Sequence, residues 1–176
     1  MRIAKDVLKS FIMGLIVMGL SVPALAKDKF ELEFEKDQEA VKLVRDTKAG
    51  GYEVISAEEL KKLIDSKKDI LIVDTMPYDD SYKKEHVPGA KQFLFPIPIM
   101  QTWDAKETGG KSLEDFAAFL GPDKDKTIVF YCGFVKCTRS HNGALFAKQL
   151  GYKNVYRFPG GIFAWKGADY KVEKVK

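Results

Sequence analysis

Cys132 and Cys137 are the residues of this 176-residue chain whose type and spacing most directly suggest chemistry. A cysteine thiolate is a strong nucleophile, and two thiols five residues apart can also exchange with each other or close a disulfide. Because the sequence holds no other cysteine, composition leaves a disulfide and a reactive thiol with a neighbour equally open. A C-x4-C spacing that lacks a second ligand pair does not indicate zinc, and we expect no metal.

The stretch after Cys132 joins an apolar segment, residues 127–131, to a segment with helical spacing. In such a strand–loop–helix, backbone N–H groups can turn inward and, with the positive end of the helix, bind an anion and favour a thiolate. Gly133 permits a sharp turn, and Lys136 and Arg139 add positive charge. We therefore predict Cys132 as the catalytic residue, although an inert cysteine that ends a core strand would look the same. The substrate-binding residues predicted with it are Gly133, Phe134, Val135, Lys136, Cys137, Thr138 and Arg139.

Cys137 is predicted as a resolving thiol. It could attack a persulfide or a sulfenate on Cys132, or it could point away from that residue. We disfavour Cys137 as the primary nucleophile, because Arg139 follows only two residues later and leaves few amides for a cradle.

The elements around this loop alternate between strands and helices. Strands are predicted at residues 52–55, 70–73, 90–95, 127–131 and 154–158. Helices are predicted at residues 56–66, 112–120 and 140–150, with a helical turn at 78–85, a loop at 101–111 and a short helix that carries Trp165. This order predicts an α/β fold with a mainly parallel central sheet of about five strands flanked by helices. Ligands of such sheets bind beyond the carboxyl ends of the strands, where Cys132 is expected.

The first 26 residues predict a secretory signal peptide. Basic residues precede an uncharged apolar run at residues 11–20, and Ala24-Leu25-Ala26 fits a cleavage site. An uncleaved membrane anchor is the disfavoured alternative, because the run is short for a bilayer. We therefore expect a periplasmic or otherwise exported protein that leaves the membrane after cleavage.

Residues 27–50 predict a charged N-terminal extension, and residues 51–176 the single folded domain. Residues 27–38 favour a mobile lead-in, with a short edge strand as the second possibility. Residues 39–47 predict a short helix that Gly50-Gly51 ends.

The charge balance argues against a nucleic-acid partner. The chain carries a net charge of +4, and loss of residues 1–26 leaves 26 Lys and Arg against 24 Asp and Glu. Because lysines and acids alternate along the sequence, no basic patch is indicated. At 45% hydrophobic and 31% charged residues, the chain is neither disordered nor a polytopic membrane protein.

Several short motifs resemble the rhodanese (sulfurtransferase) family in their order and spacing. They are Ile70–Asp74 (ILIVD), His86 to Ala90 (HVPGA), Tyr131-Cys132, Arg139-Ser140, Leu150-Gly151-Tyr152 with Asn154-Val155, and Gly160-Gly161 with Trp165. The resemblance covers roughly residues 51–165 and implies a rhodanese-like fold.

The resemblance also implies an activity. Cys132 would take a sulfane sulfur from a small anionic donor such as thiosulfate or polysulfide, and would pass it as a persulfide to a thiol or cyanide. Covalent catalysis of this kind splits one transfer into two steps and requires no organic cofactor or metal.

Two departures from the family keep other functions open. Six residues separate Cys132 from Arg139, more than in the family, and Thr75-Met76 stands where an arginine is often found. A thiol–disulfide or oxyanion-reducing protein that uses both cysteines is one rival. The other is a non-catalytic sulfur or anion carrier for an exported protein partner, and a phosphatase is the least favoured reading.

Four further residues are weighed as site candidates. His86 and Asp74 are expected to orient the chain, and His141 to face solvent. The sequence leaves open whether Trp103 and its loop border the pocket.

Overall fold

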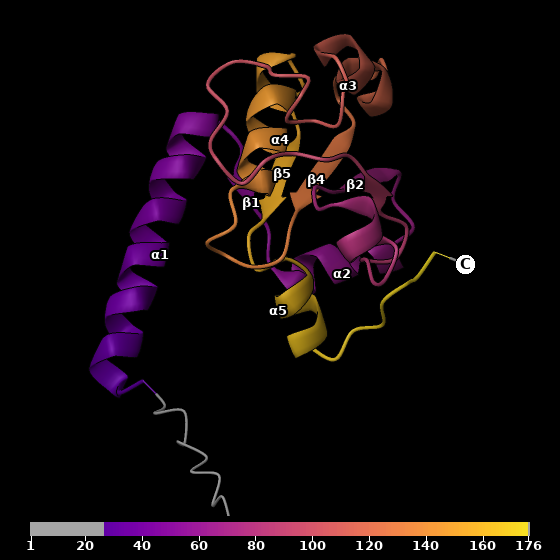
Figure 1. The fold of residues 1–176 in the computed structure, drawn as a ribbon. Helices are drawn as coiled ribbons and strands as arrows, with labels where there is room; N and C mark the ends of the chain where they lie inside the picture. The colour runs from indigo at the N-terminus through magenta and orange to yellow at the C-terminus, as the bar shows by residue number, and fades with distance from the viewer. Residues whose placement is uncertain (1–26, 176) are drawn as a thin grey trace, which may run out of the picture.

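The computed structural model describes residues 27–175, and the predicted signal peptide lies outside them. Its centre is one sheet of five parallel strands in the order β1-β5-β4-β2-β3 (Figure 1). The strands are β1 (Glu53–Val54), β2 (Ile70–Asp74), β3 (Lys91–Gln92), β4 (Thr127–Tyr131) and β5 (Val155–Phe158). The helices are α1 (Lys29–Gly50), α2 (Ala57–Asp65), α3 (Leu113–Leu120), α4 (Arg139–Gln149) and α5 (Gly161–Gly167), and a π-helical turn, η1, spans Tyr78–Tyr82. The α/β fold predicted from the sequence is confirmed.

The sheet separates two apolar cores. Along β2 and β4 successive side chains alternate between the cores, as the period of a strand requires: Val73 and Phe130 enter one, Ile72 and Val129 the other. Helices α3 and α4 cover the first core, and α2 and α5 the second. Since β4 lies between β2 and β5, the loop that follows it opens at the middle of the carboxyl edge.

Local capping explains where α2 and α3 begin. Ser56 accepts a hydrogen bond from the Glu59 amide while the Glu59 carboxylate accepts one from the Ser56 amide. Ser112 and Asp115 make the same reciprocal pair at α3. Such a box satisfies amides that the first helical turn leaves free, and both predicted starts are confirmed.

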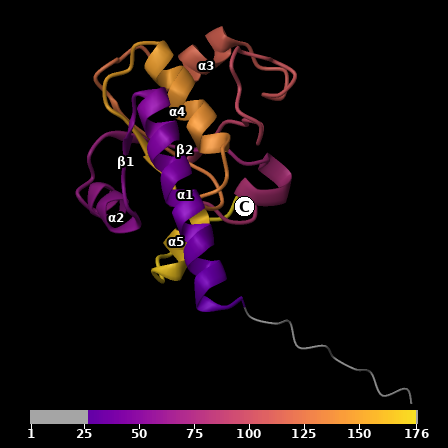
Figure 2. The ribbon, with the colours of Figure 1, turned by 90° about the vertical axis from the view of Figure 1, so that its left-hand side faces the viewer.

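Helix α1 corrects the alternative of an edge strand within residues 27–38: the chain is helical from Lys29, and the helix predicted at residues 39–47 begins there. Asp28 caps the helix by accepting from the amides of Phe30 and Glu31. Phe30 and Phe34 are exposed, so the apolar alternation that suggested a strand buries nothing. Figure 2 shows α1 crossing α4 and extending past the domain. The predicted end at Gly50-Gly51 is confirmed by the left-handed Gly51, whose amide donates to Thr47.

Strand β3 is much shorter than the predicted segment, residues 90–95. Its partner β2 ends at Asp74. Two further bonds, from the Phe93 amide to the Asp74 carbonyl and from the Phe95 amide to the Thr75 carbonyl, tie the segment after β3 to the edge of the sheet. None of the helices within residues 27–175 has the length and apolar character needed to cross a membrane.

Candidate active site

Cys132 lies where the sequence predicts, directly after β4 at the carboxyl edge of the sheet, but its thiol faces the protein interior. The residue has no exposed surface. Its Sγ lies 3.3 Å from the carbonyl oxygen of Cys137 and 3.3 Å from Oγ of Ser140. The loop therefore folds back over Cys132, helped by a bond from the Cys137 amide to the Phe134 carbonyl.

A cavity of about 390 Å³ opens above this loop. Cys137 lines it and retains a small exposed surface, 9% of the residue, whereas Cys132 does not line it. The lining consists of Met76, Pro77, Ser81, Ile97, Gly133, Phe134, Lys136, Cys137 and Arg139. The two cationic side chains of the loop thus border an otherwise largely apolar cavity beside one thiol.

The two thiols have opposite acid–base character. Burial, followed by the hydrogen bond and charge of Cys137, raises the pKa of the Cys132 thiol well above its ordinary value. The hydrogen bond from Cys132 lowers the pKa of the Cys137 thiol to about 6, and burial opposes this. The backbone N–H groups of Arg139 and Gly133 and the charge of Arg139 lower the pKa of Cys137 further. Burial therefore favours the neutral form of Cys132, whereas the groups around Cys137 favour its thiolate.

Not all the predicted substrate-binding residues face the cavity. Gly133, Phe134, Lys136, Cys137 and Arg139 line it, but Val135 and Thr138 do not. The Val135 carbonyl accepts a bond from inside the protein, and the Thr138 hydroxyl donates to the carbonyl of Ile97. The Arg139 guanidinium donates to the Phe95 carbonyl, so it also braces the segment after β3.

The start of α5 fixes the backbone of the loop. The amides of Ile162 and Phe163 donate to the carbonyls of Cys132 and Gly133, at 2.9 and 3.0 Å. Gly161 has φ +56°, and a Cβ there would overlap the Cys132 carbonyl. Only glycine permits this approach without strain, which explains the second glycine of the Gly160-Gly161 motif.

Arg157 is the functional residue that sequence reasoning missed. It lies in β5, has no exposed surface, and donates to the carbonyls of Val135 and Cys137 at 3.1 and 2.8 Å. Its Nε also donates to Oγ of Ser140 at 3.0 Å. A buried guanidinium therefore holds the loop from beneath and places the oxygen that lies next to the Cys132 thiol.

Helix α1 reaches the same loop. Asp46, buried near its end, pairs with the Arg157 guanidinium at 3.3 Å, and Glu39 pairs with the Lys136 ammonium at 3.2 Å. The N-terminal extension is thus part of the framework of the site, and its contacts could not be read from local sequence.

The remaining candidates are structural. His141 does not face solvent as expected: it is buried, because α4 packs it against Tyr52, whose hydroxyl lies 2.8 Å from Nδ1. His86 is also buried, with Nδ1 2.8 Å from the Tyr82 carbonyl oxygen. Asp74 accepts from the Met76 amide and the Tyr131 hydroxyl, which agrees with an orienting role.

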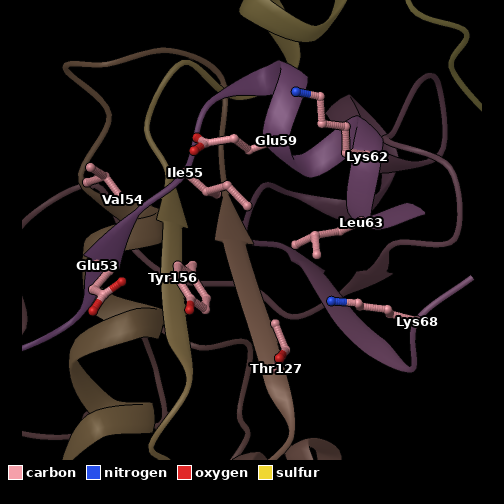
Figure 3. Close-up of a pocket in the computed structure, with 9 residues that line it drawn as sticks. All are labelled: Glu53, Val54, Ile55, Glu59, Lys62, Leu63, Lys68, Thr127 and Tyr156. Atoms are coloured by element: carbon pink, nitrogen blue, oxygen red, sulfur yellow. The ribbon is translucent and has the colours of Figure 1, made fainter. Parts of the chain in front are cut away.

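Two other features of the described chain lie away from the thiols. Trp103 packs between Phe95 and Phe116 in the core rather than lining the cavity. A second hollow lies between β1, α2 and the start of β4, at the opposite end of β4 from the cysteines (Figure 3). Across residues 27–175, no group of three or more His, Cys, Asp or Glu side chains is placed to hold a metal ion.

Comparison with known proteins assigns the family. A family model described as a rhodanese-like domain matches residues 56–168. A thiosulfate sulfurtransferase from Pseudomonas aeruginosa superposes with a TM-score of 0.57 at 22% identity, over 78% of this chain and 23% of that chain. The polysulfide-sulfur transferase homodimer from Wolinella succinogenes superposes with a TM-score of 0.52 at 18% identity, over 83% and 90%.

One relative found by sequence is a longer protein that resembles this chain over a short segment only. The tRNA uridine(34) hydroxylase of Anaplasma phagocytophilum (strain HZ) is 43% identical over 54 residues, which is 28% of this chain and 18% of that protein. The match thus spans a small part of the hydroxylase. The family model covers well over half of this chain and includes both cysteines and the loop between them. The chain belongs to the rhodanese-like domain family.

Proposed function

We propose that this protein is a sulfurtransferase that carries sulfane sulfur as a persulfide on a cysteine of the 132–139 loop. The observation that carries the proposal is a loop with two free cysteines, one of which lines a cavity that Lys136 and Arg139 border. Family membership supports sulfur transfer in general. A covalent sulfur intermediate needs a cysteine nucleophile close to groups that stabilise an anion, and this loop combines two cysteines with two cationic side chains.

The donor proposed is a small anionic sulfur compound, thiosulfate or polysulfide. Two cationic side chains at the cavity favour an anion, and the cavity accepts a molecule of that size. Two structural neighbours are named for transfer from these same compounds, which supports the class of donor. The acceptor is a thiol or cyanide, the thiophilic compounds to which a persulfide can pass its outer sulfur. Hydroxylation is not proposed, because the match to the hydroxylase spans 18% of that protein.

Thiol–disulfide exchange is the second candidate. It is favoured by the interaction of the Cys132 and Cys137 thiols, which is the largest cause of the lowered pKa of Cys137. Exchange with the disulfide of an oxidised partner would join Cys132 to Cys137 and reduce that partner to two thiols. In this chemistry the pair would pass electrons rather than sulfur.

Intact-mass measurement separates the two functions. The chain is reduced, desalted without oxygen, and exposed to thiosulfate or inorganic polysulfide. A mass gain of one sulfur, followed by its loss on addition of cyanide with formation of thiocyanate, is the expected result. No sulfur uptake and no release of sulfide from these donors, together with a loss of two hydrogens when an oxidised dithiol is supplied instead, would favour the redox function and reject sulfur transfer. A variant in which both cysteines are replaced by alanine is the control for non-covalent sulfur.

We also propose that the protein acts outside the cytoplasm, on the basis of its first 26 residues. Fractionation of the producing cells, with N-terminal sequencing of the recovered chain, tests this. A soluble periplasmic chain that begins at Lys27 is expected. A chain that still begins at Met1 in the cytoplasm would refute the proposal.

A further inference from the structure

We infer that two copies of this chain associate through helix α1, as an antiparallel pair of helices. The surface that forms the pair is an outer stripe of four apolar side chains, Phe30, Phe34, Val41 and Val44. This association goes beyond the proposed sulfurtransferase function and does not depend on it.

The outer stripe is apolar and lies in water. Phe30, Phe34 and Val44 are 73%, 66% and 67% exposed, and Val41 is 38% exposed. Among residues 27–175, neither of the two apolar cores includes a side chain of α1. Because a phenylalanine offers a large apolar area, two of them exposed on one helix indicate a surface that a partner covers.

The spacing of the stripe is that of a seam between two helices. With Asp37 included between Phe34 and Val41, the intervals are four, three, four and three residues. This alternation is that of the a and d positions of a heptad repeat, whose side chains pack between those of a second helix. The 22 residues of α1 span about 33 Å, enough for three heptads.

The opposite side of α1 faces the domain. Glu39 and Asp46 lie on that side, where they pair with Lys136 and Arg157. In Figure 2, α1 lies in front of the domain, with its outer side toward the viewer. A partner that covers the outer stripe therefore leaves the contacts between α1 and the cysteine loop in place.

The charges of α1 fit a second copy of the same helix in the reverse direction. Residues 29–39 carry five acidic and two basic side chains, whereas residues 40–50 carry three basic and one acidic. In an antiparallel pair related by a two-fold axis, the acidic half of each copy lies beside the basic half of the other. A parallel pair would instead place like-charged halves side by side.

The register follows from the stripe. When Phe34 lies opposite Val44 of the partner subunit, Glu31 lies beside Arg45 of the partner subunit. Exposed ion pairs of this kind contribute little free energy, so they set the direction of the helices more than the strength of the dimer. Asp37 within the seam lowers the affinity further. We therefore expect a reversible dimer that depends on concentration.

An anionic membrane surface fits the same stripe less well. Helices that lie on such surfaces carry lysine and arginine beside their apolar face. Here the two phenylalanines are flanked by Glu31, Glu33 and Glu35. These carboxylates would be repelled by anionic lipid, whereas the basic half of a second α1 complements them.

Sedimentation velocity over a concentration series, with a reductant present, tests the association. The protein is purified from the producing cells and its N-terminus is established by sequencing. We expect the average mass to rise from that of one chain toward twice that value between micromolar and submillimolar concentrations. A wild type that stays monomeric throughout would overturn the inference. Binding of that monomer to vesicles of anionic phospholipid would assign the stripe to a membrane surface instead.

Matched variants of α1 identify the surface. The double variant Phe34→Gln with Val44→Gln should remain monomeric at every concentration. Leu32→Gln should associate as the wild type does, because Leu32 is exposed but lies seven residues before Glu39, on the domain-facing side of the helix. Association of the double variant to the same extent as the wild type would overturn the assignment of the stripe.

Cross-linking tests the direction of the helices, in a chain that also carries Cys132→Ala and Cys137→Ala. Gln38→Cys lies at the centre of the antiparallel pair, so oxidation with diamide should join two chains through a disulfide. Glu31→Cys lies near one end and meets its counterpart only in a parallel pair, so it should stay unlinked. Linkage through Glu31→Cys, or none through Gln38→Cys in a sample that associates, would overturn the antiparallel arrangement.

Discussion

Replacement of Arg157 by methionine is expected to destabilise the protein more than almost any other single change at the site. The side chain has no exposed surface, and methionine has a similar length without charge or donors. The substitution removes one of the two cationic partners of the buried Asp46 carboxylate, and Lys42 remains as the other. It also leaves the carbonyls of Val135 and Cys137 without the donor that they have in the wild type.

The magnitude follows from the loss of one partner of a buried ion pair, about 3–5 kcal/mol. Adding a separate value for each lost hydrogen bond would count the same desolvation twice. For a domain of this size, each kcal/mol lowers the melting temperature by about 2–4 °C, so the expected decrease is about 6–20 °C. Because Lys42 also pairs with Asp46 and remains in the variant, we expect a loss of unfolding free energy toward the lower end of the about 3–5 kcal/mol range.

Urea unfolding at pH 7 measures the effect, with Arg45→Met as the matched control. Arg45 lies on α1 and is exposed, so its replacement should change the free energy of unfolding by no more than about 0.5 kcal/mol. A double-mutant cycle with Asp46→Asn isolates the ion pair from the contacts to the loop. If Arg157→Met costs less than about 1 kcal/mol, the buried guanidinium does not hold the loop, and this reasoning is refuted.

Three further outcomes can be checked. Gly161→Ala should lower the free energy of unfolding in urea by at least about 2 kcal/mol and abolish sulfur uptake, because the φ of +56° and the nearby Cys132 carbonyl leave no room for a Cβ. Gly167→Ala is the neutral control, because a Cβ at that position meets no other atom. Burial raises the pKa of Asp74 from 3.8 to about 6, so this carboxyl stabilises the fold below pH 4, and that stability is lost as the pH rises through 6. Relative to Asp74→Asn, the wild type should lose up to about 3 kcal/mol between pH 4 and pH 7, and a gain would refute the sign. Lys136→Ala should raise KM for thiosulfate about two- to fivefold with kcat unchanged, whereas an equal fall in kcat would mean that the lysine acts on the transition state.

The elements that the sequence predicts well are those whose signals are local. The run Ile70–Asp74 is aliphatic up to Val73, and the segment Thr127–Tyr131 is largely apolar, as central parallel strands usually are. Ser56 and Ser112 mark the helix starts because a capping box needs only residues three apart. The length of α1 and the end of β3 depend instead on which distant segment each one meets.

At the site, too, the features set by local sequence were predictable, and those set by distant contacts were not. The position of Cys132 at the edge of the sheet follows from the strand that it ends, and this was predictable. The direction of its thiol was not, because it depends on how the loop folds back and on Ser140 in the next helix. His141 was misplaced for the same reason: a first-turn histidine looks solvent-facing until Tyr52, 89 residues away, is brought to its ring.

Arg157 nevertheless left a signal that could have been used. A parallel strand between two others is buried on both faces, and a charged residue near its end has to find partners there. The register pairs Arg157 with Phe130, two residues before Cys132, so those partners have to belong to the neighbouring loop or to whatever covers it. The guanidinium finds them in two loop carbonyls and in Asp46 of α1. The guanidinium therefore fixes the backbone of the loop that carries both cysteines, together with the Ser140 hydroxyl beside the Cys132 sulfur.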